Sequence, residues 1–255
     1  MALNRISQCF STCQAENRAA LGIFISAGDP DAKTSQELLL GLPDAGADFV
    51  ELGMPFSDPM ADGPVIQAAS LRAIKAGKTL DKDIEMATLF RQRHPDVPLI
   101  LMGYYNPVYI YGVDRFLDDA MAAGVDGLIM VDFAPEEDSE LCLPATDKGM
   151  AFIRLITPTT NDHRLPTVIN NASGFVYYVS ITGITGTGSA SADSIADAMA
   201  RIRKASDLPA VVGFGIKHAD DVREAGRHAD GVVVGSAVVS IIAEHCDPNG
   251  NVAPD

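Results

Sequence analysis

The feature that most constrains the fold is a regular alternation of short apolar runs with longer stretches of helical composition. The eight runs are GIFIS (22–26), DFVELG (48–53), PLILMGYY (98–105), GLIMVD (127–132), AFIRLIT (151–157), GFVYYVSI (174–181), PAVVGFG (209–215) and GVVVGSA (231–237). Each run is continuous rather than alternating in polarity, which is typical of parallel strands covered by helices. Eight β/α units in 255 residues predict an α/β protein, a single (β/α)8 TIM barrel over residues 1–255.

The stretches between the runs are predicted to be the helices of this barrel. Examples are TSQELLLGLPDAGA, DKDIEMATLFRQRH, VDRFLDDAMAAG, SADSIADAMARIRKA and ADDVREAGRHA. No linker or shift in composition divides the chain, and the alternative of a doubly wound open sheet seldom needs eight strands. At the N-terminus, Ile6, Cys9, Phe10 and Cys13 recur at helical spacing, which predicts a short amphipathic helix that caps one end of the barrel.

Charge and cysteine content narrow the class of function. The formal net charge of −15 and the pI near 4.6 argue against a nucleic-acid or anionic-membrane surface, because both need clustered Lys and Arg. No run has the length of a membrane span, and the N-terminus lacks the apolar core of a secretory signal. The four cysteines and five histidines show no metal-ligand spacing, so we expect no metal, unpaired thiols and a cytoplasmic protein.

The second run ends on a carboxylate at the place where a barrel keeps its chemistry. Reacting groups of such barrels lie at the C-terminal ends of the strands and in the loops that follow. We expect Glu51 to point inward into a mostly apolar pocket, because the helix layer is unfavourable for a lone carboxylate. Burial raises the pKa of a carboxyl group and suits it to donate a proton. The alternative is a Glu satisfied by backbone donors.

The loop after this run carries a second candidate, Asp62. Pro55 and Pro59 limit the backbone freedom ahead of it, so the loop loses less entropy when it orders over a ligand. The alternative is that Ser57, Asp58 and Asp62 only form side-chain turns and caps, which is a common role of Asp in loops.

Glycines gather in the loops after the last three runs. TGITGTGSASA follows the sixth run, GFG ends the seventh, and GSA ends the eighth. Glycine lets backbone N–H groups approach an anion closely, and a helix that begins at Ser236 would direct the positive end of its dipole there. Because barrels commonly hold phosphate after strands seven and eight, we expect a phosphate site that depends on local dipoles rather than net charge.

Together these segments resemble the tryptophan synthase α subunit family. The most specific segment is ELGMPFSDPMADGPVIQ, and it occurs in order with GDP (28–30), YYNP (104–107), GITG (183–186), GFGI (213–216) and GSAVV (235–239). The resemblance runs from about Leu21 to Ile242. It implies a lyase that performs the retro-aldol cleavage of indole-3-glycerol phosphate to indole and glyceraldehyde 3-phosphate in tryptophan biosynthesis.

By this resemblance, Glu51 and Asp62 match the catalytic Glu and Asp. A protonated Glu51 can place a proton on the ring carbon that bears the glycerol chain, and an ionised Asp62 can accept the N–H of the electron-poor ring. Glu51, then ionised, can take the hydroxyl proton as the carbon–carbon bond breaks, and such transfers are worth about 10²–10⁴ in rate. The other positions carried over are Tyr177 beside the Glu, Thr185 orienting Asp62, Phe24, Met102 and Tyr104 in the indole pocket, and Gly186, Gly215, Gly235 and Ser236 at the phosphate.

For Phe24, Met102 and Tyr104 the alternative is ordinary barrel core. The resemblance also implies a partner, the tryptophan synthase β subunit, in an α2β2 tetramer. That partner holds pyridoxal phosphate, whereas this chain is expected to bind no cofactor. Segments marked by Pro55, Asn106 and Asp132 are expected to face it. Family members usually continue into another helix beyond NVAPD, so either the sequence is a piece of a longer chain or one face of this barrel is less covered than is usual in the family.

Two other functions stay open from the residues. One is another phosphate-binding barrel enzyme, such as an indole-glycerol-phosphate synthase or a Schiff-base aldolase. The chemistry of these enzymes resembles reactions that use a Lys at the end of a strand. In this sequence only Lys217 lies just past a predicted strand. The other is a noncatalytic module that docks on the β enzyme and activates it, in which case Glu51 and Asp62 would be dispensable.

Overall fold

Parallel strands form the centre of the molecule. The computed structural model describes residues 2–180, 192–213 and 215–246. All strand pairs in these ranges are parallel and belong to one sheet, with the order β5-β4-β3-β2-β1-β9-β8-β7-β6. The strands are β1 (Ala20–Ser26), β2 (Phe49–Gly53), β3 (Leu99–Gly103), β4 (Gly127–Met130), β5 (Ala151–Phe152), β6 (Arg154–Ile156), β7 (Val176–Val179), β8 (Ala210–Gly213) and β9 (Gly231–Val234).

The sheet closes through one of the predicted runs. Its two ends, β5 and β6, both come from the run AFIRLIT and are separated only by Ile153. β5 pairs with β4 on one side, and β6 pairs with β7 on the other. Eight predicted runs therefore give nine described strands, because the fifth run changes partner along its length. The predicted TIM barrel is confirmed.

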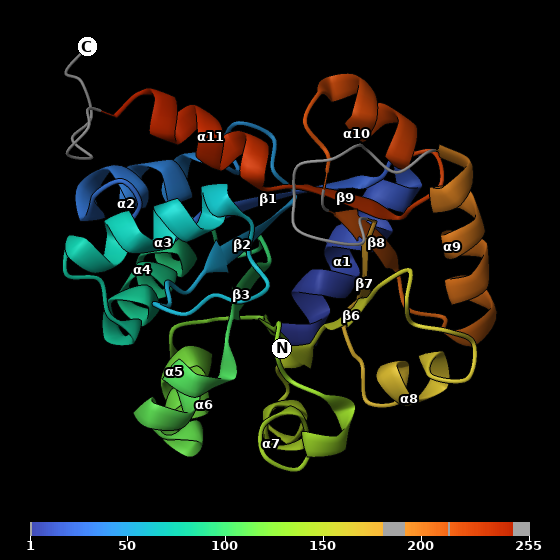
Figure 1. The fold of residues 1–255 in the computed structure, drawn as a ribbon, viewed down its shortest axis with the longest axis horizontal. Coiled ribbons are helices and arrows are strands. Elements are labelled where there is room, and N and C mark those ends of the chain that lie inside the picture. Colours follow the sequence, from blue (N-terminus) through green and yellow to red (C-terminus); the bar gives the residue numbers. More distant parts are fainter. Residues whose placement is uncertain (1, 181–191, 214, 247–255) are drawn as a thin grey trace.

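Helices surround the ring of strands (Figure 1). The five stretches predicted as helical fall on α2, α4, α6, α9 and α10, and a helix does begin at Ser236. A short 3-10 turn, η1, spans Pro135–Glu137. The described helices are α1 (Ala2–Ala15), α2 (Ala32–Gly41), α3 (Pro64–Lys75), α4 (Leu80–Arg93), α5 (Tyr105–Tyr111), α6 (Val113–Ala122), α7 (Cys142–Asp147), α8 (Leu165–Ile169), α9 (Ala192–Ala205), α10 (Ala219–Ala225) and α11 (Ser236–Glu244).

The predicted N-terminal helix is confirmed and fills one end of the barrel. Figure 1 shows α1 within the ring rather than outside it. Ile6, Phe10 and Cys13 are buried in one apolar cluster with Phe49 of β2 and with Phe175, the residue before β7. The ring centroid of Phe10 lies 6.0 Å from that of Phe49 and 5.6 Å from that of Phe175. This packing leaves the opposite end, where the strands terminate, free for a site.

Large and small residues alternate across the barrel interior. Gly22 on β1 faces Phe49 on β2, and a Cβ at Gly22 would lie 2.3 Å from the end of that ring. Gly213 on β8 similarly leaves room for Tyr177 on β7, whose hydroxyl would lie 1.9 Å from an added Cβ. Glycine is therefore required at both places by close packing rather than by backbone conformation.

Candidate active site

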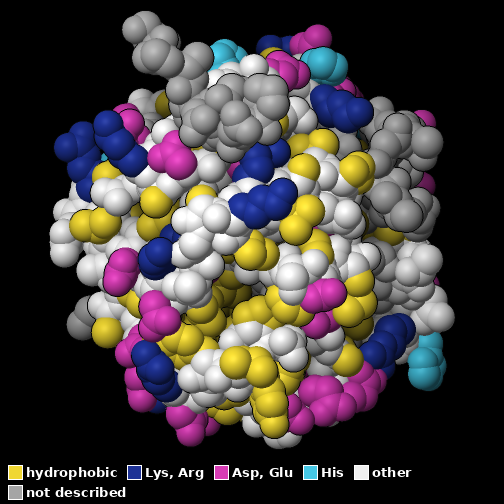
Figure 2. Space-filling view, turned by 60° about the vertical axis from the view of Figure 1, so that its left-hand side comes forward, with side chains coloured by type: hydrophobic (Ala, Val, Ile, Leu, Met, Phe, Trp, Pro, Cys, Tyr) yellow, Lys and Arg dark blue, Asp and Glu magenta, His cyan; other side chains and the backbone are white. Residues whose placement is uncertain are grey.

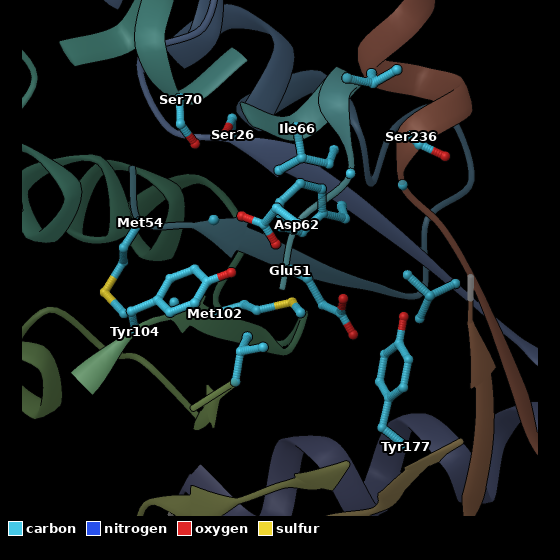
Figure 3. Close-up of a pocket in the computed structure, with 18 of the residues that line it drawn as sticks. Ser26, Glu51, Met54, Asp62, Ile66, Ser70, Met102, Tyr104, Tyr177 and Ser236 are labelled. Carbon is cyan, nitrogen blue, oxygen red and sulfur yellow. The ribbon is translucent and has the colours of Figure 1, made fainter. Parts of the chain in front are cut away.

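A pocket lies at the C-terminal ends of the strands, where the sequence predicted it (Figure 3). Its described lining draws on the ends of β1, β2, β3, β7 and β9, the loop before α3, and the first turn of α11. Four of its side chains are ionisable, two carboxyl groups and two phenols. Among the lining residues that the structure describes there is no Lys, Arg or His.

Glu51 is fully buried in this pocket. Its neighbours Val50 and Leu52 pack into the outer apolar layer, so the alternation of a strand turns Glu51 into the barrel, as expected. Its exposed fraction is 0%, and neither carboxyl oxygen has a hydrogen-bond partner among the described residues. Burial raises the pKa of Glu51 to about 8. At neutral pH the group is therefore mostly protonated, and the described backbone offers it no donors.

Tyr177 lies next to this carboxyl group. It projects from β7, and Figure 3 shows its hydroxyl directed to the same part of the pocket as Glu51. Burial raises the pKa of Tyr177 well above its usual value, and the nearby Glu51 charge raises it further. The phenol is thus a neutral group beside the Glu.

Asp62 occupies the loop between β2 and α3. Gly63 is the N-cap of α3 and Pro64 is its first residue, so the loop ends abruptly in a helix. Burial raises the pKa of Asp62 to about 6, and a hydrogen bond from the Tyr104 hydroxyl opposes that rise. Between about pH 6 and 8 the pocket therefore holds an ionised Asp62 and a protonated Glu51.

Ser57 and Asp58 lie outside the pocket. Both are exposed, and the Ser57 hydroxyl donates to the Asp58 carboxylate at 2.5 Å. They shape the turn. Within the same loop, only Asp62 among the three polar candidates lines the pocket.

The far end of the pocket is formed by glycine-bearing loops. Gly215, Gly235 and Ser236 line it, and Ser236 is the first residue of α11. Gly215 has a φ of +79°, a left-handed conformation that strongly favours glycine. Two further predicted positions, Thr185 and Gly186, lie outside the described residues.

Comparisons with known proteins assign the chain to a family. The family model described as "Tryptophan synthase alpha chain" matches residues 10–254. A tryptophan synthase alpha chain from Legionella pneumophila subsp. pneumophila shares 36% identity, with 94% of this chain and 88% of that chain covered and a TM-score of 0.84. The chain belongs to the tryptophan synthase alpha chain family.

Further solved structures are similar to this chain over most of its length. A chain from a structure titled as Mycobacterium tuberculosis tryptophan synthase is 33% identical, covers 94% of this chain and 91% of its own length, and has a TM-score of 0.88. An Aquifex aeolicus VF5 protein is 36% identical over 93% of this chain and 90% of that one, with a TM-score of 0.87. Membership confirms the expected lyase activity, cleavage of indole-3-glycerol phosphate in tryptophan biosynthesis.

The three positions matched to the family's indole pocket do line the cavity. Phe24, Met102 and Tyr104 come from the ends of β1 and β3 and from the residue after β3. Met102 and Tyr104 are also buried, and Met102 and Phe24 pack in the apolar cluster of the barrel interior. All three lie in the same pocket as Glu51 and Asp62.

Sequence reasoning missed one wall of the pocket. Ile66 and Ser70 on α3 face the cavity beside Ser26 from β1. Their spacing of four residues puts Ile66 and Ser70 on one face of a helix. Recognition of PVIQAASLRAIK as a helix that follows the Asp62 loop would have predicted this face.

The predicted partner-facing positions lie around the pocket end of the barrel. Asn106 and Asp132 are exposed, and Pro55 is half-buried. The same segments carry exposed apolar side chains, Met60 (79%) in the Asp62 loop and Ile110 (76%) on α5. Figure 2 shows hydrophobic side chains across the lower part of one face, with acidic side chains at its edge.

Within the described ranges no group of three His, Cys, Asp or Glu side chains is placed to hold a metal ion. None of the four cysteines, all of which the structure describes, forms a disulfide. Across the same ranges, no helix combines the length and apolar character needed to cross a bilayer.

Proposed function

We propose that Glu51 and Asp62 perform the cleavage of indole-3-glycerol phosphate in this pocket. Glu51 gives its proton to the ring carbon that bears the glycerol chain, and the ring nitrogen becomes electron-poor. Ionised Asp62 accepts the N–H of that ring and stabilises its positive charge. Glu51, now ionised, takes the proton of the neighbouring glycerol hydroxyl while the carbon–carbon bond breaks. Indole and glyceraldehyde 3-phosphate leave, and Glu51 is again protonated.

The observation that carries this proposal is the environment of Glu51. Glu51 has an exposed fraction of 0% and no described hydrogen-bond partner. Burial of such a carboxyl group is unfavourable for folding, so its presence is not explained by stability of the core. A pKa of about 8 keeps its proton available near neutral pH, as a general acid requires. Tyr177, which adds no charge there, supports the Glu51 carboxyl group in this proposal.

Substrate binding is assigned to two parts of the same pocket. Phe24, Met102 and Tyr104 offer apolar and aromatic surface to the indole ring. Gly186, Gly215, Gly235 and Ser236 are proposed to bind the phosphate. Support comes from the start of α11 at the pocket and from the absence of described cationic side chains there, which leaves backbone dipoles to attract the anion. Thr185 is proposed to orient Asp62.

A partner follows from the family rather than from the pocket. We infer that residues 1–255 act as one barrel domain and dock on a tryptophan synthase β subunit in a cytoplasmic α2β2 tetramer. Pro55, Asn106 and Asp132 lie in the proposed contact segments, where exposed Met60 and Ile110 supply apolar surface. In this assignment pyridoxal phosphate belongs to the partner, and this chain uses no cofactor of its own.

Indole release from indole-3-glycerol phosphate by the Glu51→Gln variant tests the assignment. Gln keeps the size of Glu51 but cannot transfer a proton, so we expect release to fall by at least about 10²-fold. The variant should still dock on the β subunit and activate it. Release at the wild-type rate would instead favour a noncatalytic docking module. Borohydride in the presence of substrate should trap no adduct, since no described lysine lines the pocket.

A further inference from the structure

One side chain outside the Asp62 loop forms hydrogen bonds with the segment that carries Asp62. The backbone N–H of Ala61 donates to the Tyr104 hydroxyl oxygen at 3.0 Å, and the same hydroxyl lies close enough to the Asp62 carboxylate for hydrogen bonding to lower the pKa of Asp62. A phenol has one O–H and two lone pairs, so it can make both bonds at once. Figure 3 shows the Tyr104 hydroxyl directed toward Asp62.

The ring of Tyr104 is itself fixed. Its exposed fraction is 2%, and it packs on Phe56 of the same loop with ring centroids 5.5 Å apart. The Gln67 side chain on α3 also donates to the backbone carbonyl of Asp62 at 2.8 Å. The other described hydrogen bonds of the loop are local or lie at its strand end, as from the Met54 N–H to the Met102 carbonyl at 2.8 Å. The backbone of Asp62 is therefore bonded to α3, whereas its carboxylate interacts with a residue that follows β3.

The backbone at Tyr104 is held in turn from the loop after β4. Tyr104 is the N-cap of α5, and the N–H of Tyr105 donates to the Asp132 carboxylate at 2.9 Å. The first N–H groups of a helix have no partner inside the helix, so this carboxylate satisfies one of them. A chain of contacts thus joins Asp132, Tyr104 and Asp62.

We propose that Tyr104 is a positioning residue that holds Asp62 over the pocket, and that Asp132 fixes Tyr104 for this task. The inference rests on the proposed function, in which Asp62 accepts the indole N–H. It adds to Tyr104 a role that a purely apolar pocket wall would not have. It also gives Asp132 a role in the isolated chain, separate from contact with a partner.

The charged surroundings of Asp62 make the effect measurable. Glu51 from β2 and Tyr177 from β7 are the other ionisable groups among the described pocket residues, and Asp132 lies near Tyr104. None of these is a cation. The Tyr104 hydroxyl lowers the pKa of Asp62, whereas burial raises it. Removal of that hydroxyl should therefore raise the pKa of Asp62, because no cation among the described pocket residues offsets the effect of burial.

The test compares Tyr104→Phe with Tyr111→Phe in the isolated chain. Both remove a phenol that is bonded to a carboxylate, but Tyr111 contacts Asp119 at 2.8 Å, away from the pocket. For Tyr104→Phe we expect kcat to fall about 10- to 100-fold, the loss typical of a hydrogen bond to a charged group. KM for indole-3-glycerol phosphate should change far less, because the phosphate loops are intact. Tyr111→Phe should match the wild type.

The pH profile separates positioning from a general structural effect. Tyr104→Phe should move the acidic limb of kcat/KM to higher pH and leave the basic limb in place. An unchanged kcat, or a lower kcat with an unmoved acidic limb, would overturn the proposal. Wild-type chain that releases no indole at all would instead count against the proposed function.

A second pair of variants tests the role of Asp132 without altering the pocket. Asp132→Ala removes the acceptor for the Tyr105 N–H, whereas Asp132→Asn keeps an acceptor oxygen. We expect Asp132→Ala to lower kcat in the same direction as Tyr104→Phe and Asp132→Asn to restore most of it. Equal rates for Asp132→Ala and wild type would contradict the role of Asp132, and this pair also decides the matter if Tyr104→Phe fails to fold.

Discussion

At the scale of the residue, two carboxyl groups of one segment have different pKa values. Glu51 has no described hydrogen-bond donor, and its pKa is raised to about 8 by burial alone. Asp62 is less enclosed and accepts a hydrogen bond from Tyr104, and its pKa is about 6. Separation of two titrations in one site is a common way to obtain an acid and an ionised carboxylate together.

A bell-shaped pH dependence follows from these two values. Activity requires Asp62 ionised and Glu51 protonated, so kcat/KM should rise through about pH 6 and fall through about pH 8.

Asp62→Asn should abolish most cleavage while the dissociation constant of glycerol phosphate changes little, since other loops are proposed to hold the phosphate. A large rise in that constant would contradict this division of roles.

Stability should also report the burial of Glu51. Its folded pKa of about 8 exceeds the ordinary 4.5, so between these values the folded chain keeps a proton that the unfolded chain has lost. Stability from this group is therefore lost as pH rises through that window. Relative to Glu51→Gln, the wild type should lose on the order of 3 kcal/mol between pH 4 and 7. Urea unfolding of both proteins across this range measures it, and parallel curves would show that Glu51 is not buried as described.

At the scale of the element, strand ends and the loops after them position the site. β2 carries Glu51 into the interior, and its loop brings Asp62 back over the pocket before Pro64 begins α3. The barrel interior around Glu51 is tightly packed, with Gly22 opposite Phe49 and Gly213 opposite Tyr177. The site thus depends on interior packing as much as on its loops.

A pair of glycine substitutions tests this packing. Gly22→Ala would place a methyl group 2.3 Å from the Phe49 ring, so we expect a loss of about 1–3 kcal/mol in unfolding free energy. Gly41→Ala at the end of α2 meets nothing within 4 Å and should be neutral or stabilise by up to about 1 kcal/mol. Denaturant unfolding compares the two, and an undisturbed Gly22→Ala variant would contradict the close approach.

Much of this arrangement was predictable from local patterns. Continuous apolar runs indicated the barrel. A lone carboxylate is unfavourable in the helix layer, and this indicated that Glu51 points into the barrel. The end of β3 was not predictable, because Tyr104 and Tyr105 favour strands but a carboxylate 27 residues away caps a helix there. The bond from Tyr104 to the Asp62 loop is likewise a tertiary contact between distant segments, with no periodic signal.

At the scale of the whole molecule, the pocket and the proposed partner surface share one end of the barrel. α1 fills the other end, so substrate must enter at the C-terminal ends of the strands, where the proposed partner segments also lie (Figure 1). The loop of Asp62 carries the exposed Met60, and Asp132 fixes α5 next to the exposed Ile110. Docking there can therefore alter the position of Asp62.

Two exposed isoleucines test this surface. Ile110→Asp on α5 should weaken activation of cleavage by added β subunit and leave cleavage by the isolated chain unchanged. Ile241 on α11 is also exposed, 56% compared with 76% for Ile110, but it lies outside the proposed contact segments. Ile241→Asp should therefore leave activation intact. Titration of indole release with the β subunit measures both. Equal activation of the two variants would place the partner elsewhere.

The proposed mechanism requires Glu51 to be protonated at neutral pH, ready to act as the acid. The most direct measurement is the titration of Glu51 itself, followed by carboxyl NMR of glutamate-labelled chain with Glu51→Gln to assign the signal. We expect Glu51 to titrate with a pKa of about 8, and Asp62→Asn to leave it protonated at pH 7. A Glu51 that titrates near the ordinary 4.5 would contradict the proposed mechanism.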